Sequence, residues 1–121
     1  VSSPALRARR TAELVAAALG HAADDIQLVP ELYLAAPRTI LDVIARQIDT
    51  LDSLLVVGHN PGLTELANGL LPELDLDDLP TAAVVAMRCH TPHWARVATA
   101  PRELAFYDFP KNRSEPLKSP R

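Results

Sequence analysis

Apolar residues recur at helical spacing in three stretches of the chain, and these stretches predict its helices. Over residues 5–19 the apolar positions return every three or four residues, which indicates a helix that packs one face. A second helix follows Pro37, with apolar positions as far as Leu51. A third is expected from residue 63 to about 71. Ser2 or Ser3 is a plausible cap for the first helix.

The remaining apolar segments are short and predict strands. Residues 54–57 (LLVV) form an unbroken apolar run, typical of a strand buried on both faces in a parallel sheet. Residues 83–88, 94–98 and 103–109 are rich in β-forming residues and are separated by turns, which indicates two or three later strands with hairpin connections. This order of elements predicts a three-layer α/β/α domain with a mixed, mostly parallel sheet.

The chain has 121 residues, which suits a single domain. We expect that domain to occupy residues 1–110. Residues 111–121 are polar and contain proline, so we interpret them as a flexible tail. The sequence opens at the cap of a helix, and the strand that would precede this helix in an α/β domain is absent. We therefore expect the domain to be N-terminally incomplete.

Composition and charge narrow the functional classes. The formal net charge is −3 and the isoelectric point is near 5.7, so the basic surplus usual for nucleic-acid binding is absent. No apolar run approaches the length that spans a bilayer, and no membrane association is expected. Cys89 is the only cysteine, which excludes an internal disulfide and fits a cytoplasmic location.

Arg7 stands in the first turn or so of the first predicted helix. Cations are better placed at the C-terminal ends of helices, so an arginine at a helix start makes sense if an anion also binds there. The exposed N–H groups of the helix start and the planar guanidinium would then bind the same anion. The alternative is that Arg7, Arg9 and Arg10 form a solvated cluster on an exposed helix face.

His59 follows the predicted buried strand and precedes the third predicted helix. Ligands collect outside the carboxyl ends of strands in open α/β sheets, where loops and helix starts converge. Asn60 is a suitable cap for the helix, and Pro61 suits its first position. His59 is thus placed to bind a phosphoryl oxygen; the alternative is a turn histidine hydrogen-bonded to the backbone.

These two segments resemble motifs of the histidine phosphatase superfamily. Residues 2–13 (SSPALRARRTAE) are similar to its arginine-bearing segment, and residues 56–63 (VVGHNPGL) to its second-histidine motif as worded in SixA-like phosphohistidine phosphatases. Residues 79–83, Trp94 and residues 104–110 match that subgroup in order and approximate spacing. The resemblance implies a phosphoglycerate mutase-like fold and a hydrolase that passes a phosphoryl group through its own histidine to water, without a metal or cofactor.

The resemblance also implies roles for single residues. Arg7 corresponds to the arginine of the phosphate pocket, His59 to its second histidine, and Asn60 lies beside them in the same motif. Glu31 is the nearest candidate for a general acid, although an exposed loop glutamate is the more ordinary interpretation. The nucleophile of the superfamily is the histidine of an Arg-His-Gly motif, and this sequence has none. We therefore expect the chain as given to be nearly inactive.

Three functional hypotheses remain open at this point. The first is a phosphatase acting on a phosphohistidine carried by another protein. The second is a non-catalytic phosphate-binding or interaction module that has lost its nucleophile. The third is a phosphatase of small phosphomonoesters, for which the short loop after the first helix leaves little room for a cap over the pocket.

Overall fold

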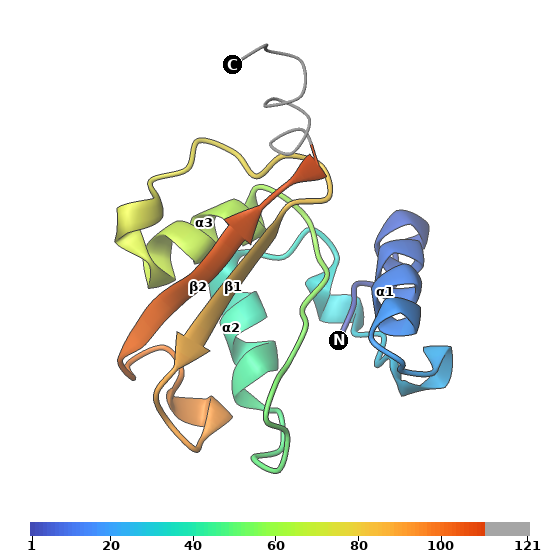
Figure 1. Ribbon diagram of the computed structural model, residues 1–121, viewed down its shortest axis with the longest axis horizontal. Helices are drawn as coiled ribbons and strands as arrows, with labels where there is room; N and C mark the ends of the chain where they lie inside the picture. Colours follow the sequence, from blue (N-terminus) through green and yellow to red (C-terminus); the bar gives the residue numbers. More distant parts are fainter. Residues whose placement is uncertain (111–121) are drawn as a thin grey trace.

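The computed structural model describes residues 1–110 and contains three helices and two strands within them (Figure 1). Four single helical turns connect these elements, and the predicted tail at residues 111–121 lies outside the described residues. The helices and strands are α1 (Leu6–Ala18), α2 (Pro37–Ala45), α3 (Gly62–Leu70), β1 (Val84–Cys89) and β2 (Arg102–Asp108).

The prediction of a mostly parallel, three-layer α/β/α fold is wrong. The one sheet found in residues 1–110 consists of β1 and β2, which pair antiparallel. Residues 54–57 form no strand, and within residues 1–110 parallel pairing is limited to isolated bridges from Ser2 to Leu28 and to Val57. Pro4 has no N–H group to extend this pairing, and α1 begins two residues later, so the chain leaves after a single bridge on each side.

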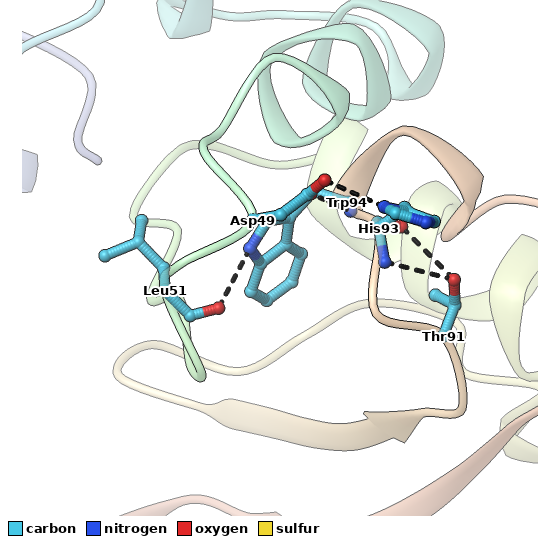
Figure 2. A network of polar contacts seen from close by, with 5 residues as sticks. All are labelled: Asp49, Leu51, Thr91, His93 and Trp94. Carbon is cyan, nitrogen blue, oxygen red and sulfur yellow. Dashed lines mark hydrogen bonds and ion pairs between the residues drawn. The ribbon is translucent and has the colours of Figure 1, made fainter.

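Of the two or three later strands expected, two are present, and the segment at 94–98 is not a strand. The predicted strands at 83–88 and 103–109 correspond to β1 and β2, which carry a register shift between Ala86 and Met87. Trp94–Arg96 is instead a helical turn. The Trp94 backbone N–H, which could pair in a strand, donates instead to Asp49 in the loop after α2, and the indole N–H of the same residue donates to the Leu51 carbonyl (Figure 2).

The first and third helices agree with the prediction to within one residue at each end, but α2 is shorter than its apolar pattern indicates. It ends at Ala45, and both Ile48 and Leu51 are exposed. The side-chain amide of Gln47 donates to the Val43 carbonyl, one of the acceptors freed at the end of a helix. Across residues 1–110, no helix is both long and apolar enough to cross a membrane.

The hydrophobic core lies between α2, α3 and the turns next to them. β1 covers this core from one side through Met87 and Cys89, while α1 stands apart on the other side of the molecule (Figure 1). The buried side chains of α1 are all alanines, which allow close approach but bury little area. The main cluster consists of Val29, Leu32, Ile40, Val43, Ile44, Leu66, Leu70 and Val97.

Arg102 fastens the start of β2 to the end of α3. Its guanidinium donates to the Leu70 carbonyl at 2.7 Å, which satisfies a carbonyl in the last turn of α3. The same group also donates to three carbonyls of the preceding loop, those of Val97, Ala98 and Ala100. A planar group with five donors suits this arrangement better than a lysine would.

Gly62 lets α3 approach the segment before α2. A Cβ at this position would overlap the carbonyl oxygen of Ala35, and it would also lie close to the Ile40 side chain. Gly69, near the other end of the same helix, faces open space. A side chain is therefore excluded at position 62 and tolerated at position 69.

Replacing Gly62 with alanine is expected to lower the free energy of unfolding by about 1–3 kcal/mol, because the new methyl group meets backbone that cannot move aside. Gly69→Ala is the matched control and is expected to raise it by about 0.5–1 kcal/mol through helix propensity. Urea unfolding followed by circular dichroism measures both. Equal effects of the two substitutions would show that the close approach at Gly62 is not restrictive.

Candidate functional site

The backbone of residues 1–3 runs between two segments that are distant in sequence. On one side, Ser2 accepts a hydrogen bond from the Val29 N–H at 2.8 Å and donates to the Gln27 carbonyl at 2.9 Å. On the other side, the Ser3 N–H donates to the Val57 carbonyl at 2.9 Å. This arrangement brings the start of α1 next to the turn that carries His59.

His59 is buried, with 7% of its surface exposed, and is contacted by two side chains. Its Nε2 atom lies 2.8 Å from the Ser3 hydroxyl oxygen, a contact between residues 56 positions apart. The ring of Tyr33 meets it edge to face, with the centroids 5.4 Å apart and the planes at 77°. The imidazole is therefore fixed at one nitrogen and against one aromatic ring.

Arg7 lies one residue into α1 and is exposed to solvent. Within residues 1–110 its guanidinium makes no ion pair, and the first turn of α1 contains no acidic residue. Its charge is close enough to His59 to act on the protonation of that ring. An uncompensated cation at the positive end of a helix is a suitable arrangement for an anion.

Among residues 1–110, no side chain caps the start of α1. Neither predicted serine performs this role: the Ser2 hydroxyl donates to the Ser3 carbonyl, and the Ser3 hydroxyl accepts from the Ala5 N–H at 3.3 Å. The N–H groups of the first helical turn are thus left for another acceptor. An anionic ligand in front of α1 would be such an acceptor.

Burial lowers the pKa of His59, and the nearby positive charge of Arg7 lowers it further. Both causes favour the neutral imidazole over the imidazolium ion. A neutral imidazole carries one N–H donor and one acceptor nitrogen, so it can donate to a phosphoryl oxygen without bearing a charge.

Asn60 directs its side chain toward a neighbouring loop. Its amide nitrogen donates to the Leu79 carbonyl at 3.0 Å, and its amide oxygen accepts from the Thr64 hydroxyl at 2.8 Å. Thr64 in turn accepts from the Leu79 N–H. These contacts hold the loop after α3 against the start of that helix. The peptide bond between Asn60 and Pro61 is cis.

Glu31 binds Arg46 and not Arg7 or His59. Its carboxylate forms a 3.0 Å ion pair with Arg46, just after α2. The hydrogen bond from Arg46 is the main reason that the pKa of Glu31 is lowered. A general acid at neutral pH needs a raised pKa, so the observed direction is opposite to that role.

Two residues of the site, Ser3 and Tyr33, are not among the candidates drawn from the sequence. From the sequence, Ser3 has only the setting of a helix cap, and its neighbour Pro4 supports that interpretation locally. Both residues reach His59 through contacts between separate segments, and no periodicity or local spacing encodes such contacts. The structure places the charge of Arg7 near His59 and adds contacts from Ser3 and Tyr33 to that ring.

Comparison with known proteins gives relatives but no activity. No family model matches the chain, and no solved structure matches it. Two proteins described as uncharacterized, Rv1276c and MT1313 from two strains of Mycobacterium tuberculosis, are each 31% identical to it over 120 residues. The match covers 90% of this chain and 71% of each relative. The chain therefore belongs to the same protein family as these mycobacterial proteins.

The charge of Arg7 is expected to act on the ionisation of His59. In an NMR titration, the His59 pKa should lie below the ordinary value of about 6.5. Arg7→Ala should raise this pKa only part of the way, because burial is the larger cause. Arg9→Ala is the control, since Arg9 is also exposed but lies about 200° around the helix from Arg7.

The same ionisation also makes folding stability depend on pH. Because the pKa is lower in the folded chain, the unfolded chain binds the proton more readily as the pH falls below about 6.5. His59 therefore contributes stability that is present above this pH and is lost as the pH falls toward its folded-state pKa. A wild-type His59 pKa at or above the ordinary value, or an equal effect of Arg9→Ala, would contradict this account.

Proposed function

We propose that His59 and Arg7 form the phosphoryl-binding part of a phosphatase of the histidine phosphatase superfamily. In this proposal the substrate is a phosphohistidine carried by another protein, and the reaction takes place in the cytoplasm. The observation that carries the proposal is the convergence of three features of residues 1–110 at one place: a buried imidazole whose pKa is lowered, a guanidinium without an ion pair and a helix start without a side-chain cap. The sequence resemblance of residues 2–13 and 56–63 points to the same two residues.

Each of these groups would perform a definite task on a phosphoryl group. The guanidinium of Arg7 offers two parallel N–H donors to two oxygens, and the N–H groups at the start of α1 favour negative charge. Neutral His59 donates one further hydrogen bond. Phosphoryl transfer depends mainly on positioning and on neutralising the charge of the equatorial oxygens, so donors held in place supply much of what the reaction needs.

The nucleophile is the part that residues 1–121 do not supply. The Ser3 hydroxyl lies within hydrogen-bond reach of His59, as in a serine hydrolase, but Ser3 is 0% exposed and no substrate can reach it. His93 is bound to Asp49, and His90 lies 3.4 Å from Glu103. His21 follows the C-terminal end of α1, the opposite end of the helix from Arg7. In this proposal, hydrolysis through a phosphohistidine intermediate therefore uses a histidine from outside this sequence.

Two observations bear on the substrate. Tyr33 is 56% exposed beside His59, so this edge of the candidate site is open to a large partner. The chain from the end of α1 to α2 contains only two single helical turns and carries no lid. An open site suits a phosphohistidine on a protein surface better than it suits a small phosphomonoester.

A second function is favoured by the lack of an Arg-His-Gly motif: a module that binds phosphate without hydrolysing it. Both functions require the same binding site, and they differ only in turnover. The first experiment therefore tests binding, and the second tests turnover.

Inorganic phosphate is expected to bind the chain, as measured by isothermal titration calorimetry at low ionic strength. Arg7→Ala should weaken binding by about 10-fold to 100-fold, since hydrogen bonds to charged groups are worth about 1.5–3 kcal/mol. His59→Ala should weaken it by about 10-fold. Arg9→Ala removes the same charge from the other side of α1 and should change binding little. Absence of phosphate binding, or equal losses from Arg7→Ala and Arg9→Ala, would refute the site.

Translating the gene upstream of the Val1 codon distinguishes the hydrolase from the binding module. If the protein is a hydrolase, the upstream sequence should contain an apolar strand that ends in Arg-His-Gly. The longer protein should then release phosphate from a phosphohistidine-bearing protein, as measured by an assay of free phosphate. His59→Ala in that longer protein should lower kcat. A gene without this motif would leave the binding module as the function of the chain.

A further inference from the structure

Ser3 is a fully enclosed polar side chain at the candidate site. It is 0% exposed, so no solvent reaches its hydroxyl group. The hydroxyl oxygen has two neighbours among residues 1–110: the Ala5 N–H at 3.3 Å and the Nε2 atom of His59 at 2.8 Å. Since the Ala5 N–H can only donate, the direction of the second hydrogen bond decides whether every group is satisfied.

Only one direction of the Ser3–His59 hydrogen bond pairs both groups that form it, the serine hydroxyl and the ring nitrogen Nε2. If His59 Nε2 carried a hydrogen and donated it, the Ser3 oxygen would accept twice and its own hydrogen would have no acceptor among residues 1–110. A buried donor left unpaired in this way is costly. If the Ser3 hydroxyl donates to Nε2, the oxygen accepts from Ala5, and both the serine hydroxyl and Nε2 are paired. The second arrangement requires Nε2 to be unprotonated.

We propose that Ser3 is a positioning residue that holds His59 as the Nδ1–H tautomer, with Nε2 bound to the serine and Nδ1–H presented to the phosphoryl group. This inference rests on the proposed function only for its last part, the identity of the ligand. The tautomer itself follows from the hydrogen bonds of two buried side chains.

The surroundings of the ring act in the same direction. Protonating His59 would place a hydrogen on Nε2 and force the unfavourable arrangement at Ser3. Arg7 is the charged group whose field reaches the ring, and it opposes a second positive charge. Tyr33, the aromatic group in contact with the ring, contributes an edge-to-face contact. The ring nitrogens therefore have distinct roles across the neutral pH range.

The neighbouring serine provides a matched control. Ser2 is also 0% exposed, and its hydroxyl donates to the Ser3 carbonyl without contacting His59. Ser2→Ala and Ser3→Ala thus each remove one buried serine hydroxyl, one residue apart. Ser3→Thr keeps the hydroxyl group and is the conservative variant.

The test is a long-range ¹H–¹⁵N NMR correlation of the histidine rings in the full chain at neutral pH, with His59 assigned through His59→Gln. In the wild type, Nε2 should have the chemical shift of an unprotonated ring nitrogen and Nδ1 that of a protonated one. Ser3→Ala should move the equilibrium toward the Nε2–H form by roughly tenfold, the value of one ordinary hydrogen bond. Ser3→Thr should restore the wild-type pattern, and Ser2→Ala should not change it.

Titration with inorganic phosphate then separates the two proposals. Phosphate should shift the Nδ1 resonance of His59 and leave Nε2 nearly unchanged. If the tautomer is as expected but phosphate has no effect on Nδ1, the proposed function fails and the positioning role of Ser3 stands. A wild-type ring protonated at Nε2, or an unaltered tautomer in folded Ser3→Ala, would overturn the inference. Should Ser3→Ala not fold, the wild-type spectrum and Ser3→Thr decide the question.

Discussion

The hydrogen bonds made by the backbone of residues 1–3 are the constraint on which the candidate site depends. They join residues 27–29 on one side and 55–57 on the other, and so hold three distant parts of the chain together. Helix α1 lies outside the main hydrophobic cluster, and its buried side chains are alanines. Without the hydrogen bonds of residues 1–3, the small apolar area that α1 buries would do little to hold the start of this helix, which carries Arg7, beside His59. The site is therefore located by a few directional bonds more than by packing.

Sequence patterns predicted the elements that depend on local spacing. The limits of α1 and α3 agree to within a residue, and two late strands appear as β1 and β2. The failures have a common cause, because contacts between distant segments decided the outcome. Asp49 and Leu51 take the polar groups of Trp94, which turns a β-rich segment into a helical turn. The apolar run at 54–57 suits a buried strand, but its neighbour at 1–3 turns away at Pro4 before a ladder can form.

In the candidate site, too, residues with a recognisable local setting could be predicted from the sequence, and residues that act through distant contacts could not. Arg7 and His59 could be selected from the sequence because each has a recognisable local setting, a helix start in one case and a turn before a helix in the other. Asn60 has the right neighbours in sequence, yet its side chain binds Thr64 and Leu79 on the side of the following loop. Ser3 and Tyr33 could not be selected, because a serine before a proline and a tyrosine in a loop are ordinary in isolation. Their importance comes from a ring that folding brings to them.

The contact between Trp94 and the loop after α2 has a practical consequence for the study of folding. Trp94 is the only tryptophan of the chain, and its indole N–H is bound to the Leu51 carbonyl. Its fluorescence therefore reports on the docking of residues 91–96 against the end of α2 (Figure 2). The ring signals of His59 report on a different long-range pairing, that of residues 1–3 with the turn after residue 57. The chain thus contains one optical and one magnetic reporter for two separate tertiary contacts, and coincidence of their transitions is a direct measure of cooperative unfolding.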